Sequence, residues 1–338
     1  MSEKKFFDSS LSNQSSKILT LMRCICVITV VLMHSNVSHL VSYDNSKICD
    51  GFIRLVASYT TINILFILSG YFFFSKDKTL NLSSYKKKLY KRVKTLVIPY
   101  CLWCIFGFIF NTIIGQQYSV DIVETIQQIF WGDPIVEGHP AGRAMWYIRN
   151  LIVFAILSPI YYIVVRLFKH LSLVIVAITS FAFVGPTYDF PFFNPYLLFG
   201  VYCAMYNFSF DKICSLIPMK YISLLVAVVS ILNTITDIFY KPDIFTTLIF
   251  FIFLYIILGK ITLHKMFVVS CTFLYMSHMY LTSVLRNVFV KVFPDNIIFN
   301  LLAIVMTWVL SIVLCVTVYY ILKKYANNFL QILTGGRA

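Results

Sequence analysis

Long apolar stretches dominate this chain of 338 residues and limit the folds that are open to it. About ten of them approach the roughly 20 residues that a helix needs to cross the hydrocarbon core of a membrane. They cover residues 18–40, 51–75, 96–115, 146–166, 170–186, 191–208, 217–236, 243–260, 266–289 and 296–322. Only 12% of the residues are charged, whereas a soluble domain has about 25%. The sequence therefore predicts an all-α, polytopic membrane helix bundle with about ten transmembrane helices.

The lysines and arginines between these stretches predict the orientation of the bundle. Ten spans place both termini on one side, and if that side is cytoplasmic, the inner segments hold most of the 28 basic residues. This asymmetry follows the positive-inside rule and accounts for the net charge of +14, so no nucleic-acid partner is expected. We expect a cytoplasmic arm over 1–17, a transmembrane domain over 18–322 and a cytoplasmic tail over 323–338.

Two loops carry helical patterns of their own. In the first, "SKDKTLNLSSYKKKLYKRVKTLVIPY" (75–100), apolar side chains recur on one helical face among lysines. This pattern predicts a basic interfacial helix that leads into the third span and bends at Pro99. In the second, an apolar face over 119–130 predicts a helix that lies on the outer surface.

The first span holds two residues that are costly in hydrocarbon, Arg23 and His34. An arginine there costs about 2.5–3.5 kcal/mol on insertion scales. Eleven residues are almost three helical turns, so both side chains share one face, about 16 Å apart along the axis. A neutral imidazole can act as a general base near pH 7. The alternative is that His34 reaches the interface or bonds a neighbouring helix.

Other polar residues in the spans are weaker candidates for substrate binding. Trp146, Tyr147 and Arg149 open the fourth span on its expected outer side, where they could bind a sugar or form an aromatic belt. His278 and Arg286 lie a little over two helical turns apart and could face one cavity, although a structural hydrogen bond would also explain His278.

Two further motifs have structural interpretations. The Cys101-Leu-Trp-Cys104 spacing is that of a redox motif, but its apolar setting predicts packing residues, so neither a disulfide nor a metal site is expected. The segment "LSG" (68–70) predicts close helix packing.

Short motifs also occur in a characteristic order along the chain. "RCICVITVVLMH" lies in the first span, "NILFILSGYFFF" ends the second, and "LVIPYCLW" begins the third. The fourth span opens with "WYIRNLIV" and continues to "LSPI", and the ninth contains "CTFLYMSHMYL". In this order the motifs resemble those of the acyltransferase family 3 membrane proteins over nearly the whole chain.

The resemblance implies an enzyme of the bacterial inner membrane. Such proteins move an acyl group, usually acetyl, from cytoplasmic acyl-coenzyme A (acyl-CoA) to a hydroxyl of a sugar or lipid-linked glycan at the outer face. It implies that His34 is the catalytic base, and it matches Arg23 to the family's first-span arginine. The implied partners are acyl-CoA, the glycan acceptor and membrane lipids, with no permanently bound cofactor.

The resemblance also implies that basic residues before the third span hold the coenzyme's phosphates. The candidates are Lys88, Lys91, Arg92 and Lys94. The family's arginine-x-x-arginine pattern falls on Arg92 and Thr95, or in a shifted register on Lys91 and Lys94, so the match is imperfect. Lysine would act there as a point charge without the bidentate geometry of arginine.

The sequence leaves alternatives open at the level of mechanism and of function. Direct transfer with His34 as base competes with a covalent acyl-enzyme on His34 or Ser35. A transporter or flippase for a glycan or small anion could use Arg23, His34 and the basic loop as its pathway. No matched pair of interrupted helices is evident in the two halves, which argues against transport. The acceptor and the acyl chain length stay undetermined.

Overall fold

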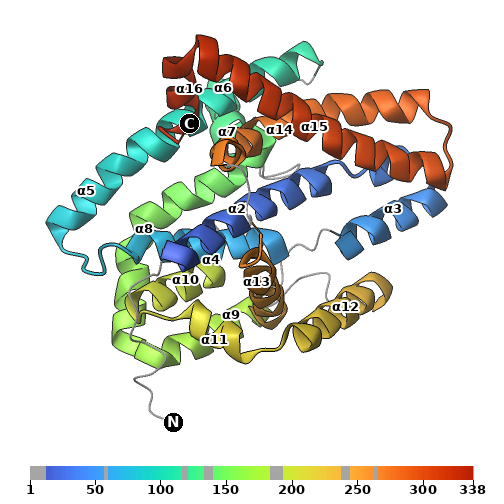
Figure 1. The fold of residues 1–338 in the computed structure, drawn as a ribbon. Helices are drawn as coiled ribbons and strands as arrows, with labels where there is room; N and C mark the ends of the chain where they lie inside the picture. The colour runs from blue at the N-terminus through green and yellow to red at the C-terminus, as the bar shows by residue number, and fades with distance from the viewer. Residues whose placement is uncertain are drawn as a thin grey trace.

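The protein is described by a computed structural model, which covers residues 13–56, 60–115, 121–132, 140–182, 193–236, 244–261 and 265–337. These residues form helices and no strands (Figure 1). The α-helices are α2 (Asn13–His34), α3 (Tyr43–Val56), α4 (Thr60–Phe74), α5 (Leu82–Arg92), α6 (Ile98–Ile113), α7 (Ile122–Phe130), α8 (Trp146–Phe168), α9 (Ser172–Ala182), α10 (Pro195–Met205), α11 (Phe210–Leu216), α12 (Met219–Thr236), α13 (Ile244–Leu258), α14 (Lys265–Val292), α15 (Ile297–Tyr325) and α16 (Asn327–Thr334). Short helical turns are η1 (Ser38–Leu40), η2 (Val93–Val97), η3 (Arg143–Met145) and η4 (Lys169–Leu171).

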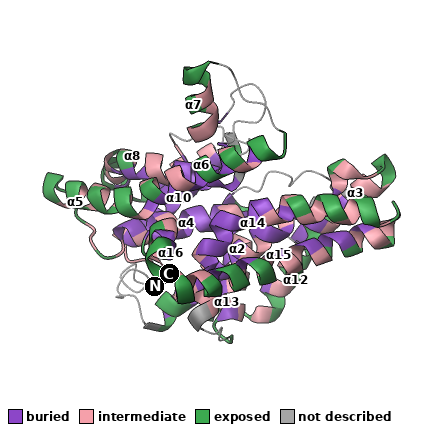
Figure 2. Ribbon diagram, turned by 90° about the horizontal axis from the view of Figure 1, so that it is seen from above, coloured by how far each residue is buried: buried purple, intermediate pink, exposed green. Residues whose placement is uncertain are grey.

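The first helix, α2, lies at the centre of the bundle and contacts α4, α13, α14 and α15 (Figure 1). Its apolar side chains are buried, including Leu19, Met22 and Val31. Figure 2 shows the same arrangement from above, with the buried residues concentrated on α2, α4, α10 and α14. The helix that carries Arg23 and His34 is thus enclosed by other helices.

Helices α4 and α10 approach each other closely because each has a glycine at the contact. A Cβ atom on Gly70 would lie 2.3 Å from the carbonyl oxygen of Leu197, and one on Gly200 would lie 2.1 Å from that of Ile67. Only a residue without a side chain fits at either position. The close packing predicted for Leu68–Gly70 is therefore confirmed.

The expected count of about ten spans is not confirmed. Within the described ranges, six helical segments are long and apolar enough to cross a membrane, or seven if α11 and the first part of α12, bent by 92° to each other, cross as one. Helices α10 and α13 are apolar but shorter. The stretch at 170–186 begins as α9, whose 11 residues reach only about 16 Å at 1.5 Å per residue. Residues 183–192 lie outside the described ranges.

The predicted basic helix is present and continues into the next span. Helix α5 leads without a break through η2, a π-helical turn, into α6. Asn81 caps its start by accepting a hydrogen bond from the Ser84 amide. Pro99 lies in the first turn of α6, where its missing amide hydrogen is tolerated. Leu96 on the apolar face is buried.

The helix expected over 119–130 is α7, and Ser119 lies outside the described residues. Asp121 caps it by accepting hydrogen bonds from the amides of Val123 and Glu124. The side chains of Ile122 and Val123 are 74% and 72% exposed, and Figure 2 shows α7 standing apart from the central helices. These exposed apolar side chains fit a helix that rests in a membrane interface.

The C-terminal segment folds onto the bundle. Helix α16 packs against α6, and the Trp103 indole donates a hydrogen bond of 3.1 Å to the Leu333 carbonyl oxygen. Leu330 and Thr334 are fully buried. The segment expected as a tail over 323–338 therefore includes a packed helix, and of the expected arm over 1–17 the structure describes only residues 13–17.

Candidate functional site

A cavity of about 170 Å³ opens between α2, α4, α8 and α14. Three arginines line it: Arg23 from α2, Arg92 from the end of α5, and Arg337 from the chain beyond α16. The other lining residues are Val27, Leu65, Leu68, Ser69, Phe72, Phe73, Leu96, Tyr147, Ile148, Leu151, Phe154, Cys271, Thr272, Tyr275 and Met276. None of these described residues is acidic, so the cavity is apolar with a concentrated positive charge.

The three guanidinium groups affect one another across this cavity. The Arg92 guanidinium lies 5.1 Å from the centre of the Phe73 ring, a cation–π contact. Burial, together with the positive charges of Arg23 and Arg92, lowers the pKa of Arg337 to about 9. A pKa so far below the usual value indicates that the cationic form of Arg337 is poorly compensated by the protein itself. An anionic ligand would supply that compensation.

Of the four basic residues predicted to hold phosphates, Arg92 lines the cavity and the three lysines do not. The Lys88 ammonium donates a hydrogen bond of 2.8 Å to the Asp77 carbonyl oxygen and lies 3.6 Å from the Asp77 carboxylate. Lys91 and Lys94 are exposed, and the Lys94 ammonium lies over the Tyr90 ring at 4.9 Å. Lys88 is thus held by Asp77, and Lys91 and Lys94 lie on the surface outside the residues that line the cavity.

Two tyrosines close one side of the cavity. Tyr147 and Tyr275 are buried with ring centres 5.5 Å apart. The Tyr147 hydroxyl lies 2.8 Å from the Ser69 hydroxyl and donates to the Leu65 carbonyl oxygen at 3.1 Å, whereas the Tyr275 hydroxyl donates to the Ala144 carbonyl oxygen at 2.6 Å. These bonds fix both rings. Tyr147, for which the sequence left sugar binding or an aromatic belt open, lines the arginine cavity.

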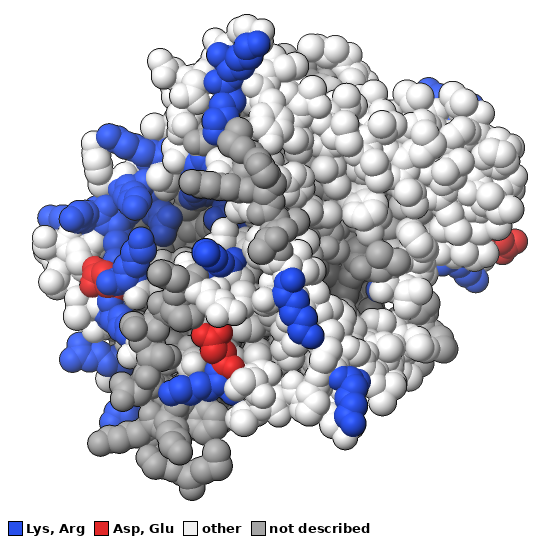
Figure 3. Space-filling view, viewed as in Figure 1, with Lys and Arg blue, Asp and Glu red and all other residues white. Residues whose placement is uncertain are grey.

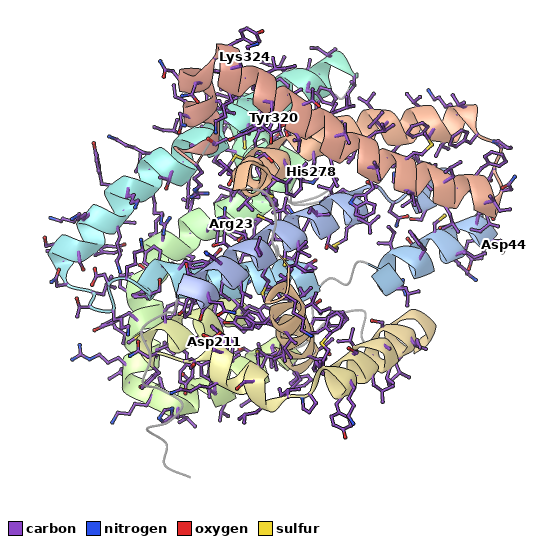
Figure 4. The ribbon with its side chains drawn as sticks, viewed as in Figure 1. Arg23, Asp44, Asp211, His278, Tyr320 and Lys324 are labelled. Atoms are coloured by element: carbon purple, nitrogen blue, oxygen red, sulfur yellow. The ribbon has the colours of Figure 1, made fainter. Side chains whose placement is uncertain are left out.

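Behind the tyrosines lies a pair of histidines. The rings of His34 and His278 have centres 5.3 Å apart, and the Tyr275 ring centre is 5.9 Å from that of His278. His34 is half-buried and His278 is fully buried. In Figure 4, Arg23 and His278 both lie within the bundle, whereas Asp44 lies at its edge. A line of aromatic side chains thus connects the arginine cavity to His34.

The hydrogen bonds of His278 indicate which of its ring nitrogens carries a hydrogen. Its Nδ1 atom lies 2.7 Å from the Tyr275 carbonyl oxygen, and because a carbonyl can only accept, Nδ1 carries the hydrogen. In the neutral ring Nε2 is then an acceptor, and this atom is buried with no hydrogen-bond partner among the described residues. It belongs to a ring whose centre lies 5.3 Å from that of His34.

The structure places the remaining candidates elsewhere. Trp146 is buried in the core, next to Phe66. Arg149 is buried and donates a hydrogen bond to the Trp131 carbonyl oxygen, which ties α8 to the end of α7. Arg286 donates to the Asn36 carbonyl oxygen at 3.3 Å and lines a different cavity of about 130 Å³. His278 is not among the residues that line this second cavity.

Comparison with known proteins identifies the family of the chain. The family model described as the acyltransferase domain of acyltransferase family 3 matches residues 17–320. The chain belongs to acyltransferase family 3. It is therefore a membrane acyltransferase, an enzyme that transfers acyl groups other than aminoacyl groups. No curated protein and no solved structure gives a significant match to the chain.

Sequence reasoning missed two components of the arginine cavity, Tyr275 and Arg337. Tyr275 was visible only as one aromatic residue in an aromatic-rich span. Arg337 stands next to the C-terminus, beyond the residues that the family model matches. The one local signal near it is the Gly335–Gly336 pair, which is typical of a turn that ends a helix and redirects the chain.

Proposed function

We propose that this acyltransferase moves an acyl group, acetyl in the simplest case, from cytoplasmic acyl-CoA to a hydroxyl of an extracytoplasmic or lipid-linked glycan. The observation that supports this proposal best is the arginine cavity, which is separated from the His34–His278 pair only by buried tyrosines. An anion site next to a proton acceptor is the arrangement that transfer from an anionic thioester donor requires.

The donor binds on the side where the basic residues gather. Figure 3 shows lysines and arginines concentrated at the end of the molecule where α5 lies. The phosphates of CoA are attracted to this surface, and Arg92 and Arg23 bind them at the cavity through charge-assisted hydrogen bonds. By the positive-inside rule, this end faces the cytoplasm, and the membrane is the bacterial inner membrane.

The acyl thioester passes beyond the tyrosines to reach His34. The long, thin pantetheine arm carries it there while the phosphates stay with the arginines. His34 removes the proton of the acceptor hydroxyl, and the resulting oxygen attacks the thioester carbonyl carbon. The tetrahedral intermediate collapses with cleavage of the carbon–sulfur bond, and the departing CoA thiolate takes the proton from His34. An ester and CoA are the products, and His34 is neutral again.

His278 acts as a positioning residue for His34. When His34 gains a proton, its ring becomes a cation with a second N–H group. The Nε2 atom of His278 accepts that hydrogen bond, because the bond from Nδ1 to Tyr275 holds Nε2 in its acceptor form. This arrangement stabilises the charged ring at the moment of transfer.

The proposal is tested with inverted membrane vesicles that contain the protein and the surface glycan of its host. With radiolabelled acetyl-CoA outside the vesicles, label is expected in the glycan, and the glycan mass is expected to rise by one acetyl group. The His34→Ala protein, inserted to the same level, is expected to give none. Full labelling by His34→Ala would exclude the assigned base, and no labelling by the unaltered protein would exclude the reaction.

A further inference from the structure

The chain beyond α16 is shaped to bring Arg337 into the arginine cavity. Gly335 and Gly336 both have positive φ angles, 64° and 74°, a conformation that favours glycine. The Gly335 amide donates to the Ile332 carbonyl oxygen and the Gly336 amide to that of Gln331, so the turn is held by backbone bonds. Immediately after this turn, Arg337 lines the cavity with Arg23 and Arg92.

This turn is anchored against the donor side of the bundle. A Cβ atom on Gly335 would lie 2.4 Å from the Thr95 carbonyl oxygen, so the backbone of Gly335 lies directly against Thr95. Thr95 is in η2, three residues after Arg92. The Trp103–Leu333 hydrogen bond and the buried side chain of Leu330 hold α16 in place on the same side. Arg337 thus enters the cavity next to the helical turn that carries Arg92.

The position of Arg337 is not explained by interactions with acidic groups. No aspartate or glutamate is among the described residues that line the cavity, whereas two other guanidinium groups are. A half-buried arginine beside two like charges destabilises the protein unless an anion is present. Arginine is also the side chain best suited to bind phosphate through two parallel hydrogen bonds.

We propose that Arg337 binds a phosphate group of the acyl donor together with Arg92, and so supplies from the C-terminus a cation that position 95 lacks. The inference rests on the proposed function, since it assigns a further residue to the donor site. Thr95 cannot provide the charge, and Gly335 occupies the space beside it. The C-terminal turn is therefore a part of the donor site, joined to it in space and not in sequence.

The test compares two acetyl donors with the purified full-length protein in detergent. Acetyl-CoA carries the phosphates, and S-acetylpantetheine has the same thioester without them. For Arg337→Ala and Arg337→Gln, the KM for acetyl-CoA is expected to rise about 10- to 150-fold, the range for loss of a charge-assisted hydrogen bond. The KM for S-acetylpantetheine is expected to stay unchanged.

Lys324→Ala provides the matched control. This substitution also removes one cation near the C-terminus, but Lys324 is exposed and its ammonium lies over the Tyr325 ring, and it is not among the residues that line the cavity. Figure 4 shows it at the edge of the bundle. Its KM values for both donors are expected to equal those of the unaltered protein.

Thermal unfolding separates ligand binding from a structural role. Without a donor, Arg337→Ala is expected to be at least as stable as the unaltered protein, because it relieves repulsion among the three arginines. Added CoA is expected to raise the Tm of the unaltered protein more than that of the variant. A variant that fails to fold, or that binds acetyl-CoA as tightly as the unaltered protein, would overturn the role of Arg337. If the unaltered protein itself gains no stability from CoA and uses neither donor, the proposed function fails instead.

Discussion

Replacement of His278 by asparagine tests how the histidine pair works. The asparagine side-chain NH₂ can take the place of Nδ1 and donate to the Tyr275 carbonyl oxygen, which lies 2.7 Å from Nδ1 in the structure. The substitution removes the ring nitrogen Nε2, which is buried without a hydrogen-bond partner among the described residues and which we propose as the acceptor for protonated His34. It therefore deletes the interaction that we assign to catalysis and keeps the hydrogen bond that fixes the side chain.

The expected effect follows from the type of bond that is lost. A hydrogen bond to a charged group contributes about 1.5–3 kcal/mol. If that bond forms only when His34 is protonated in the transition state, kcat should fall by roughly 10- to 150-fold. The KM for acetyl-CoA should not change, because the arginine cavity is untouched. The assay is transfer of radiolabelled acetyl to glycan, with rates divided by the number of acetyl-CoA binding sites.

Two comparisons make the result decisive. Ser270→Ala is the control on the same helix, because the Ser270 hydroxyl is buried and donates to the Phe267 carbonyl oxygen within α14. It should retain normal kcat. In a protein that already carries His34→Ala, adding His278→Asn should cost nothing further, since the two side chains act as a unit. A normal kcat for His278→Asn, or independent effects of the two substitutions, would refute the proposed role of His278.

Three further predictions concern the donor site, the packing and the pH dependence of stability. Arg92→Ala should raise the KM for acetyl-CoA about 10-fold or more in steady-state assays. Lys91 lies outside the cavity, so Lys91→Ala should change this KM little. Equal effects of the two substitutions would mean that surface charge alone attracts the donor. Gly200→Ala should lower the free energy of unfolding by about 1–3 kcal/mol or more through overpacking, as measured by thermal unfolding. Gly259→Ala is the control, because the nearest contact of its new Cβ atom would be 3.5 Å, and it should behave like the unaltered protein. Similar Tm values for both variants would contradict the close contact of α4 and α10. Hydrogen bonds from Asn300, Asn45 and the Ser42 amide lower the pKa of Asp295 from 3.8 to about 2. The stability that the Asp295 carboxylate contributes should therefore be lost as the pH falls from 3.8 to about 2. The Tm of Asp295→Asn should not show this contribution to the fall in Tm over the same pH range.

The features that could be predicted from the sequence are those set by local pattern. Alternating basic and apolar residues over 75–100 were enough to predict α5, because a helix with that pattern has one surface for water and one for the bundle. The shared face of Arg23 and His34 follows from helical periodicity alone. The glycine contact at Gly70 was predictable because a small residue in an apolar helix commonly marks close packing.

The sequence did not show which helices pack against each other. For His278 the sequence left open a cavity shared with Arg286 or a structural hydrogen bond, and the structure shows a hydrogen bond to the Tyr275 carbonyl oxygen. The contact of His278 with His34 could not be predicted, because periodicity within α14 contains no information about the neighbouring α2. Likewise, periodicity within α8 does not show that Tyr147 lines a cavity with Arg23 and Tyr275. Arg337 reaches the cavity because the Gly335–Gly336 turn redirects the chain and Gly335 packs against Thr95. No pattern in the sequence links Thr95 to residues so far along the chain.

The fixed tyrosine pair has a consequence for the cell that contains this enzyme. A protein that transfers a chemical group across a membrane must not allow protons or metal ions to permeate. The hydroxyls of Tyr147 and Tyr275 are each bonded to a backbone oxygen, so neither is available to coordinate an ion. An uncharged thioester loses little when it leaves water, but a hydrated ion would have to shed its water to enter this apolar region. The transfer that we propose would therefore leave the ion gradient across the membrane intact.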